Sequence, residues 1–339
     1  MAELILHIGS HKTGTSSIQH FLAAQREALA REDVAYLLPD RDGRHSAFNL
    51  IRTSGELEGF RARVHRARAD RLLQPRATRN IVSTEIFFWL SDPEEVATLA
   101  ELIRPRFDRI TVLAYLRRQD LLAVSHRNQV MNGAPALQFY GLRAHPLPDY
   151  RPHLHRYFDY AAKLLDLWGG AFGQDSLRIV PFEPASLAGG DVVTDFATRL
   201  GFDLAPAAPV RRNTSTGIER LFVGLKLAEM GLLDDLRRHV FPRLDKGGKF
   251  LPTRAEAEAF LAPFLPSNAR LTAEVRTDGK PFAFSPSMEM YPEIAGELWT
   301  SDRVERIVEA LLHARTATGI KARTARRPRS DPSGDTERR

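Results

Sequence analysis

The sequence contains no cysteine, which excludes disulfides, zinc-thiolate sites, iron–sulfur clusters and cysteine nucleophiles. Long apolar runs are also missing, because no stretch approaches the roughly 18 uncharged apolar residues that a membrane span requires. The chain starts with neither the basic segment nor the apolar run of a signal peptide. We therefore expect no membrane insertion and no signal peptide, and we expect the protein in the cytoplasm.

Lysine is scarce as well, since only seven of the 48 basic residues are lysine and the other 41 are arginine. The formal net charge is +6, but residues 321–339 alone carry seven basic and three acidic residues. This segment is rich in Pro, Ser, Thr and Arg without apolar periodicity, which predicts a disordered basic tail. The rest of the chain shows no basic stripe with interleaved aromatic residues, so we expect no nucleic-acid partner.

Strand-like and helix-like segments alternate along the chain. A chain of 339 residues with 43% hydrophobic content can bury a large core. The expected strands are residues 4–8, 34–38, 80–84, 110–116 and 177–182, and the expected helices include 16–31 and 191–200. Residues 41–74 are expected to be polar and helical. The alternation predicts an α/β fold with a parallel five-stranded sheet flanked by helices.

We expect one domain over residues 1–320. Within it, residues 213–320 are expected to form a mainly helical C-terminal annex.

The segment after the first expected strand has the composition of a phosphate-binding loop. It reads Gly9-Ser10-His11-Lys12-Thr13-Gly14-Thr15-Ser16-Ser17 and leads directly into a helix. Glycines allow backbone N–H groups to converge on one point, and the helix start adds its positive dipole end. The lysine and the hydroxyls add charge-assisted hydrogen bonds, so this loop predicts an anion site.

The loop differs from the nucleotide-triphosphate pattern G-x-x-x-x-G-K-[ST]. Gly9 and Gly14 have the required spacing, but Thr15 occupies the place of the lysine and Lys12 lies inside the loop. The segment Lys12-Thr13-Gly14-Thr15-Ser16 resembles the 5′-phosphosulfate loop of sulfotransferases that use 3′-phosphoadenosine 5′-phosphosulfate (PAPS). This resemblance implies five parallel strands in a P-loop-kinase-like arrangement. It also implies that Lys12 acts catalytically and that His11, Thr13, Gly14, Thr15, Ser16 and Ser17 bind the donor with it.

A second motif supports the resemblance. The expected strand at residues 110–116 is followed by Arg117, and Ser125 lies eight residues later on an expected helix. The same family carries an arginine and a serine at this spacing, which bind the 3′-phosphate of PAPS. Arg117 and Ser125 are therefore the expected 3′-phosphate ligands. Gln119 replaces a proline common in the family, which leaves open whether Arg117 or Arg118 contacts the phosphate.

Two residues are candidates for the base that accepts the proton of the acceptor. Glu85 directly follows the third expected strand, and the carboxyl ends of parallel strands face the ligand crevice. Glycan sulfotransferases carry a glutamate at a similar place. His45, which follows the second expected strand, is the rival candidate. A cap or an ion pair for Glu85, and a solvated loop position for His45, are the simple structural alternatives.

The remaining expectations concern the nucleotide, metals and the acceptor. Arg212 lies in Arg211-Arg212-Asn213-Thr214-Ser215, which resembles a short segment of bacterial members. This segment could close over the nucleotide as the basic loop of animal cytosolic sulfotransferases does, and the alternative is a helix N-cap with a solvated arginine pair. The histidines show no metal-ligand spacing, and no metal is expected.

The resemblance implies transfer of a sulfuryl group to a hydroxyl or amine, and we expect a saccharide or glycolipid acceptor. A P-loop nucleotide kinase or NTPase and a non-catalytic nucleotide-binding protein are the alternatives, and the oligomeric state is left open.

Overall fold

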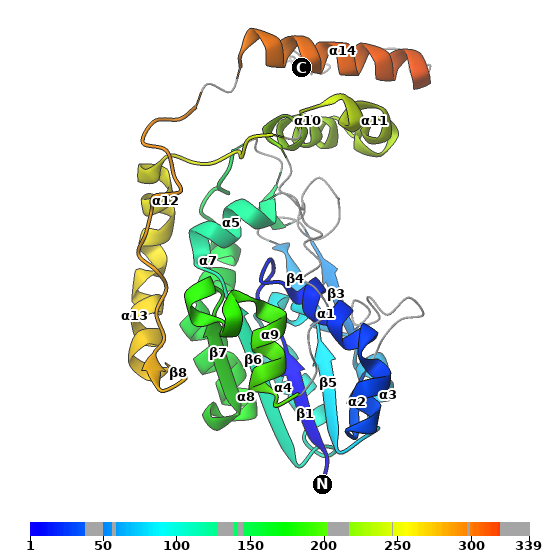
Figure 1. Ribbon diagram of the computed structural model, residues 1–339, viewed down its shortest axis with the longest axis vertical. Coiled ribbons are helices and arrows are strands. Elements are labelled where there is room, and N and C mark those ends of the chain that lie inside the picture. The colour runs from blue at the N-terminus through cyan, green and yellow to red at the C-terminus, as the bar shows by residue number, and fades with distance from the viewer. Residues whose placement is uncertain are drawn as a thin grey trace, which may run out of the picture.

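A five-stranded parallel sheet forms the centre of the protein (Figure 1). The computed structural model describes residues 1–37, 50–55, 59–127, 139–141, 145–202, 217–245, 247–296 and 299–318. The strands, in their spatial order, are β2 (Val34–Tyr36), β5 (Arg79–Ser83), β1 (Glu3–His7), β6 (Arg109–Leu116) and β7 (Leu177–Pro181). Every neighbouring pair is parallel, so the five expected strands and the α/β class are confirmed.

Both faces of the sheet are buried, because successive side chains of a strand point to opposite faces. Leu4 and Leu6 of β1 join the larger hydrophobic core, whereas Ile5 between them joins the core on the other face. In β6, Val112 and Leu113 divide in the same way. Burial on both faces explains why these strands read as continuous apolar runs in the sequence.

Helices cover the two faces. The face that contains Ile5 is covered by α1 (Thr15–Ala24), α2 (Arg26–Arg31) and α9 (Val192–Arg199), which lie in front of the sheet in Figure 1. The other face packs against α4 (Pro93–Ile103), α7 (Pro152–Phe158), the π-helix η5 (Ala162–Trp168) and α8 (Gly169–Phe172). The short 3-10 helix η3 (Glu85–Trp89) and α5 (Gln119–Arg127) follow β5 and β6 at the carboxyl edge of the sheet. Further 3-10 turns are η6 (Gln174–Ser176), η7 (Pro184–Ser186) and η8 (Ala188–Gly190).

The single helix expected over residues 16–31 is wrong, because the chain forms two helices there. Gln25 adopts φ −95° and ψ 11°, which ends α1, and its carbonyl accepts the N–H of Leu29 in α2. The change of direction brings Leu29 into the same core as Ile18 and Phe21. The apolar spacing identified the buried positions but not the break between them.

The helical expectation for residues 41–74 is also wrong at residues 51–54 and 61–64, and residues 41–49 and 56–58 lie outside the described part of the chain. An antiparallel hairpin forms from β3 (Ile51–Ser54) and β4 (Arg61–Val64), followed by α3 (Arg66–Leu72). Phe60 and Ala62 are buried while Arg61 and Arg63 are exposed, which is the alternation of a strand with one buried face. The many charged residues of this segment made it look polar and helical, so the alternation of a strand was not recognised in the sequence.

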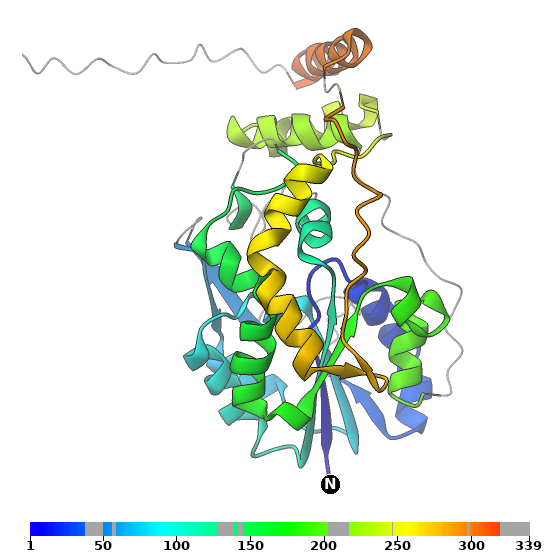
Figure 2. The same ribbon diagram turned by 90° about the vertical axis from the view of Figure 1, so that its left-hand side faces the viewer.

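The C-terminal region is mainly helical, as expected, and its helices pack in two places. It contains α10 (Ile218–Glu229), α11 (Leu233–Val240), η9 (Phe241–Arg243), α12 (Arg254–Leu261), η10 (Ala262–Phe264), α13 (Leu265–Glu274) and α14 (Ser301–Thr318). Helices α10, α11 and α14 share a small core beyond the carboxyl ends of the strands (Figures 1 and 2). Helices α12 and α13 and the η10 turn between them instead pack on the main core through Phe260, Leu271 and Phe264, respectively.

A hairpin of two short strands, β8 (Arg276–Thr277) and β9 (Lys280–Pro281), attaches this region to the sheet. The Thr277 Oγ1 hydroxyl donates a hydrogen bond to the Ile179 carbonyl of β7 at 2.8 Å. Among the described helices, none combines the length and the apolar character that crossing a bilayer would require. The expected basic tail lies outside the described residues.

Candidate functional site

The loop between β1 and α1 leaves the sheet at its carboxyl edge. Ile8 and Ser10 still donate to β6, to the carbonyls of Leu113 and Tyr115 at 2.9 and 3.0 Å. Beyond them the chain turns through Lys12 at φ 63° and Gly14 at φ 79°. A Cβ at Gly14 would lie 2.6 Å from Val192 Cγ1, so this position combines a left-handed backbone with close contact to α9.

Six successive backbone N–H groups of this loop, those of residues 11–16, have no acceptor in the described part of the chain. The next two, from Ser17 and Ile18, donate to the Gly14 carbonyl at 2.8 and 3.1 Å and begin α1. The hydroxyls of Ser10 and Thr15 are buried, and neither has a hydrogen-bond partner among the described residues. Because buried polar groups are normally paired, this concentration of unused donors at a helix start fits an anion.

Lys12 lies at the centre of this loop with its side chain half-buried. Burial lowers the pKa of the Lys12 ammonium, the positive charge of Arg117 lowers this pKa further, and the Glu85 carboxylate opposes both effects. Lys12, Arg117 and Glu85 come from the ends of β1, β6 and β5, which are adjacent strands. The structure therefore brings these three predicted residues together at one edge of the sheet.

The two arginines after β6 have different surroundings. Arg118 is buried, and its guanidinium makes a bidentate pair with Asp120 at 2.7 and 2.9 Å. It also donates to the carbonyls of Ser285 and Ser287, so it fixes the C-terminal segment to the sheet edge. Arg117 is half-buried, and its Nη1 donates to the Lys12 carbonyl at 3.4 Å. Arg117 is thus the arginine of the pair that reaches the loop.

Helix α5, which carries Ser125, contacts the same loop. His126, the neighbour of Ser125, stacks on His11 with ring centroids 4.4 Å apart and an interplanar angle of 19°. Ser125 itself is half-buried.

Glu85 begins η3, directly after β5. The cap of η3 is the Thr84 hydroxyl, which accepts the Ile86 N–H at 3.2 Å, so Glu85 is not the capping group. Burial raises the pKa of the Glu85 carboxyl, while its own N–H, the Gln19 side chain and the Lys12 charge lower it. The Gln19 amide donates to Glu85 Oε2 at 3.4 Å and to the Ser83 carbonyl at 3.0 Å. A carboxyl group with a raised pKa beside an anion loop is suited to proton transfer.

The His11 side chain points away from the loop interior. Its Nδ1 hydrogen-bonds the Tyr157 hydroxyl at 2.7 Å, and burial lowers the pKa of His11 to about 3, which keeps the ring neutral. Trp89 lies against the same ring with centroids 4.5 Å apart. His11 therefore joins the loop to a cluster of aromatic rings.

Sequence reasoning missed Gln19 and Tyr157 as residues that support this site. Tyr157 lies 146 residues from its partner His11, and Gln19 lies 66 residues from Glu85, so no local spacing could reveal them. His45 and Arg212, the other two expected site residues, lie outside the described residues.

Comparisons with known proteins give a distant structural likeness. No protein-family model matches the chain, and no curated protein matches it. Among solved structures, the chain is similar to a sulfotransferase from Alicyclobacillus acidocaldarius with a TM-score of 0.40 and 18% sequence identity. The alignment covers 79% of this chain and 94% of that chain. We therefore base the assignment of function on this chain's own side chains.

Proposed function

We propose that the protein is a sulfotransferase that uses PAPS as its donor. The observation that carries this proposal is the loop at residues 11–16, which contains Lys12 and contacts Arg117, and whose six backbone N–H groups have no acceptor among the described residues. PAPS presents two anionic groups, and the structure offers two adjacent places that suit them. The backbone N–H groups of residues 11–16 and the hydroxyls of Thr13, Thr15, Ser16 and Ser17 would hold the 5′-phosphosulfate.

Arg117 and Ser125 would hold the 3′-phosphate. The Arg117 guanidinium lies next to the loop, and among the described residues no carboxylate forms an ion pair with it. Arg118 is engaged with Asp120 and two carbonyls, which supports Arg117 rather than Arg118 in this role. Arg212 remains a proposed further contact to the nucleotide.

The chemical roles follow from charge and position. PAPS would supply the sulfuryl group. Lys12 would stabilise the negative charge that develops on the donor side of the reaction, because a preoriented cation needs no reorganisation when charge appears there. Glu85 would accept the proton of an acceptor hydroxyl or amine, and its raised pKa brings its basicity closer to that of a base working at neutral pH. His45 stays an alternative base.

Calorimetry with full-length protein separates this proposal from a nucleotide kinase or NTPase. We expect adenosine 3′,5′-bisphosphate to bind in the presence of EDTA and ATP with magnesium to bind much more weakly. Arg117→Ala should weaken bisphosphate binding by about tenfold or more, since hydrogen bonds to charged groups contribute about 1.5–3 kcal/mol. Arg104→Ala, an exposed arginine at the end of α4, is the matched control and should bind as the wild type does.

Two results would overturn the assignment. Binding of magnesium-ATP without binding of the bisphosphate would favour a kinase or NTPase. Bisphosphate binding that is equally strong in Arg117→Ala would remove Arg117 from the site.

A further inference from the structure

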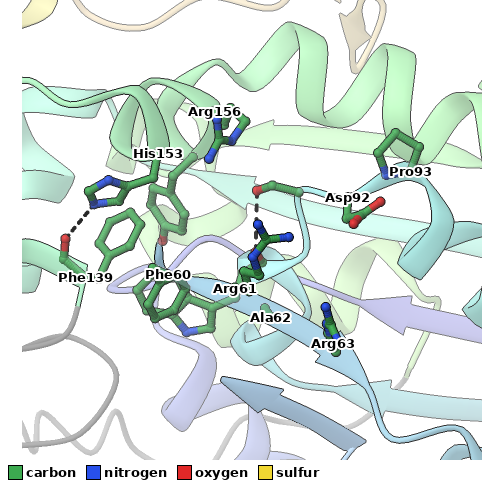
Figure 3. Close-up of a pocket in the computed structure, with 12 residues that line it drawn as sticks. Phe60, Arg61, Ala62, Arg63, Asp92, Pro93, Phe139, His153 and Arg156 are labelled. Carbon is green, nitrogen blue, oxygen red and sulfur yellow. Dashed lines mark hydrogen bonds between the residues drawn. The ribbon is translucent and has the colours of Figure 1, made fainter. Parts of the chain in front are cut away.

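A cavity of about 260 Å³ lies between β4, the end of η3 and α7 (Figure 3). Four aromatic residues line it, Phe60, Trp89, Phe139 and Tyr157, and each is at least 92% buried. Trp89 and Phe139 meet edge to face with centroids 4.6 Å apart, and Trp89 and Phe60 lie 4.9 Å apart. The cavity therefore offers an apolar aromatic wall.

Three arginines line the same cavity: Arg61, Arg63 and Arg156 (Figure 3). Arg61 and Arg63 are two residues apart on β4, so they extend from the same face of the strand. All three are exposed, and within the described residues none of them pairs with a carboxylate. An aromatic wall with three unpaired guanidinium groups suits a ring that carries an anionic substituent.

Acidic groups near the cavity are already engaged. Asp92 lines it and caps α4 by accepting the Glu94 N–H at 3.0 Å. Glu95 accepts the Val64 N–H of the hairpin at 2.7 Å. The lining therefore contains three guanidinium groups and one carboxylate, that of Asp92. The remaining lone pairs of Asp92 could accept a ligand hydroxyl.

The cavity shares its aromatic wall with the donor loop. Trp89 and Tyr157 line the cavity, and both also contact His11 in the loop. Glu85 and Trp89 are the two ends of η3, and four residues of 3-10 helix span about 8 Å. The cavity and the proposed base therefore lie at opposite ends of one short helix.

We propose that this cavity binds a carboxylate-bearing saccharide unit of the acceptor, with the sugar ring against the aromatic wall and its carboxylate on Arg61, Arg63 and Arg156. This inference rests on the proposed function, because it names the acceptor class of that same reaction. A sugar ring has an apolar C–H face that packs on aromatic rings, and a carboxylate matches the two parallel N–H donors of a guanidinium.

The test uses two aryl glycosides that differ only in the anionic group. Calorimetry compares 4-nitrophenyl β-D-glucuronide with 4-nitrophenyl β-D-glucoside on wild-type protein, Arg61→Gln, Arg63→Gln and Arg156→Gln. We expect the glucuronide to bind at least about tenfold more tightly than the glucoside. Each of the three variants should lose about tenfold in affinity for the glucuronide and keep its affinity for the glucoside.

Arg104→Gln is the matched control. It replaces an exposed arginine at the C-terminal end of α4, about 16 Å along the helix from the cavity at Pro93. Adenosine 3′,5′-bisphosphate is titrated into every variant as a second ligand, and unchanged binding shows that the donor loop is intact.

The outcomes separate the two proposals. Equal affinity for the two glycosides, or full glucuronide affinity in all three arginine variants, would overturn the acceptor site while bisphosphate binding still supported the sulfotransferase. Arginine-dependent glucuronide binding in a protein that does not bind the bisphosphate would overturn the proposed function and the acceptor role with it.

Discussion

The donor loop and the arginine-lined cavity are both positive, but they are built in different ways. The donor loop takes most of its donors from one short stretch, residues 11–16, as backbone N–H groups at a helix start. The cavity takes its charges from side chains on β4 and α7, which lie more than 90 residues apart. Backbone donors depend on the conformation of the chain and cannot be removed by changing one side chain. The three arginines can be replaced one at a time, because none of them forms an ion pair among the described residues.

The largest expected effect concerns Glu85, which belongs to η3 between the two regions. Glu85→Gln should lower kcat by about 10²–10⁴, because it removes the proton acceptor and leaves the donor loop intact. The rate, measured with labelled donor and the best acceptor from a saccharide panel, should rise with pH as Glu85 loses its proton, at a pH above the ordinary range of glutamate. It should fall again at high pH as Lys12 loses its proton below the usual pKa of lysine.

Glu85→Gln should abolish the acidic limb of this profile and keep bisphosphate binding. An unchanged rate would exclude Glu85 as the base and would support His45. No measurable transfer by the wild type would instead support a protein that binds the nucleotide without transferring a group.

The next effect concerns Lys12 in the donor loop. Lys12→Ala should lower kcat by about 10²–10³, since it removes one preoriented positive group from the reacting centre. The same labelled-donor assay measures it. Lys249→Ala, which removes an exposed lysine, should leave the rate unchanged. Similar losses in both variants would point to a general effect of charge instead of a local role for Lys12.

Gly14 tests whether the donor loop depends on its backbone conformation. Gly14→Ala should destabilise the fold by about 1–3 kcal/mol in urea unfolding, because the residue sits at φ 79° and its Cβ would meet Val192. Adding Val192→Ala should recover only the part of the lost unfolding free energy that comes from the contact between the new Cβ and Val192. Gly170→Ala places its Cβ in open space within a helix and should cost nothing. Equal stability of Gly14→Ala and the wild type would show that the loop conformation is not constrained.

The smallest effect concerns Lys163, buried behind the aromatic wall. Its Nζ donates to the Leu90 carbonyl and the Ser91 hydroxyl, both at 2.8 Å. Burial lowers the pKa of Lys163 to about 7, and the positive charge of Arg156 adds to this. Above pH 7 the unfolded chain keeps a proton that the folded chain has released, so this residue makes stability rise with pH until the unfolded lysine also titrates.

Between pH 7 and 9, the unfolding free energy of the wild type should therefore rise more steeply than that of Lys163→Met, by about 1 kcal/mol per pH unit. Urea unfolding at several pH values measures the difference in slope. Parallel curves would mean that Lys163 keeps its ordinary pKa.

The parts of the structure that depend on residues close together in the sequence could be predicted from the sequence. The strands were visible because both faces of a parallel sheet are apolar, and the loop before α1 was visible because its glycines and Lys12 are adjacent in the chain. The β3–β4 hairpin was missed because its exposed arginines hide the alternation of buried Phe60 and Ala62.

The tertiary contacts of the site needed the structure. The spacing to Ser125 favoured Arg117 but left Arg118 open. The pairing of Arg118 with Asp120 and the hydrogen bond from Arg117 to the Lys12 carbonyl distinguish the two arginines. The contact of Tyr157 with His11 and the cavity behind it join segments whose proximity no local pattern encodes.

A crystal structure of the full-length protein with adenosine 3′,5′-bisphosphate tests the central claim most directly. We predict the 5′-phosphate against the N–H groups of residues 11–16 and the 3′-phosphate on Arg117 and Ser125. Occupation of the loop by magnesium-ATP in a parallel soak, with no bisphosphate bound in the first, would contradict the account.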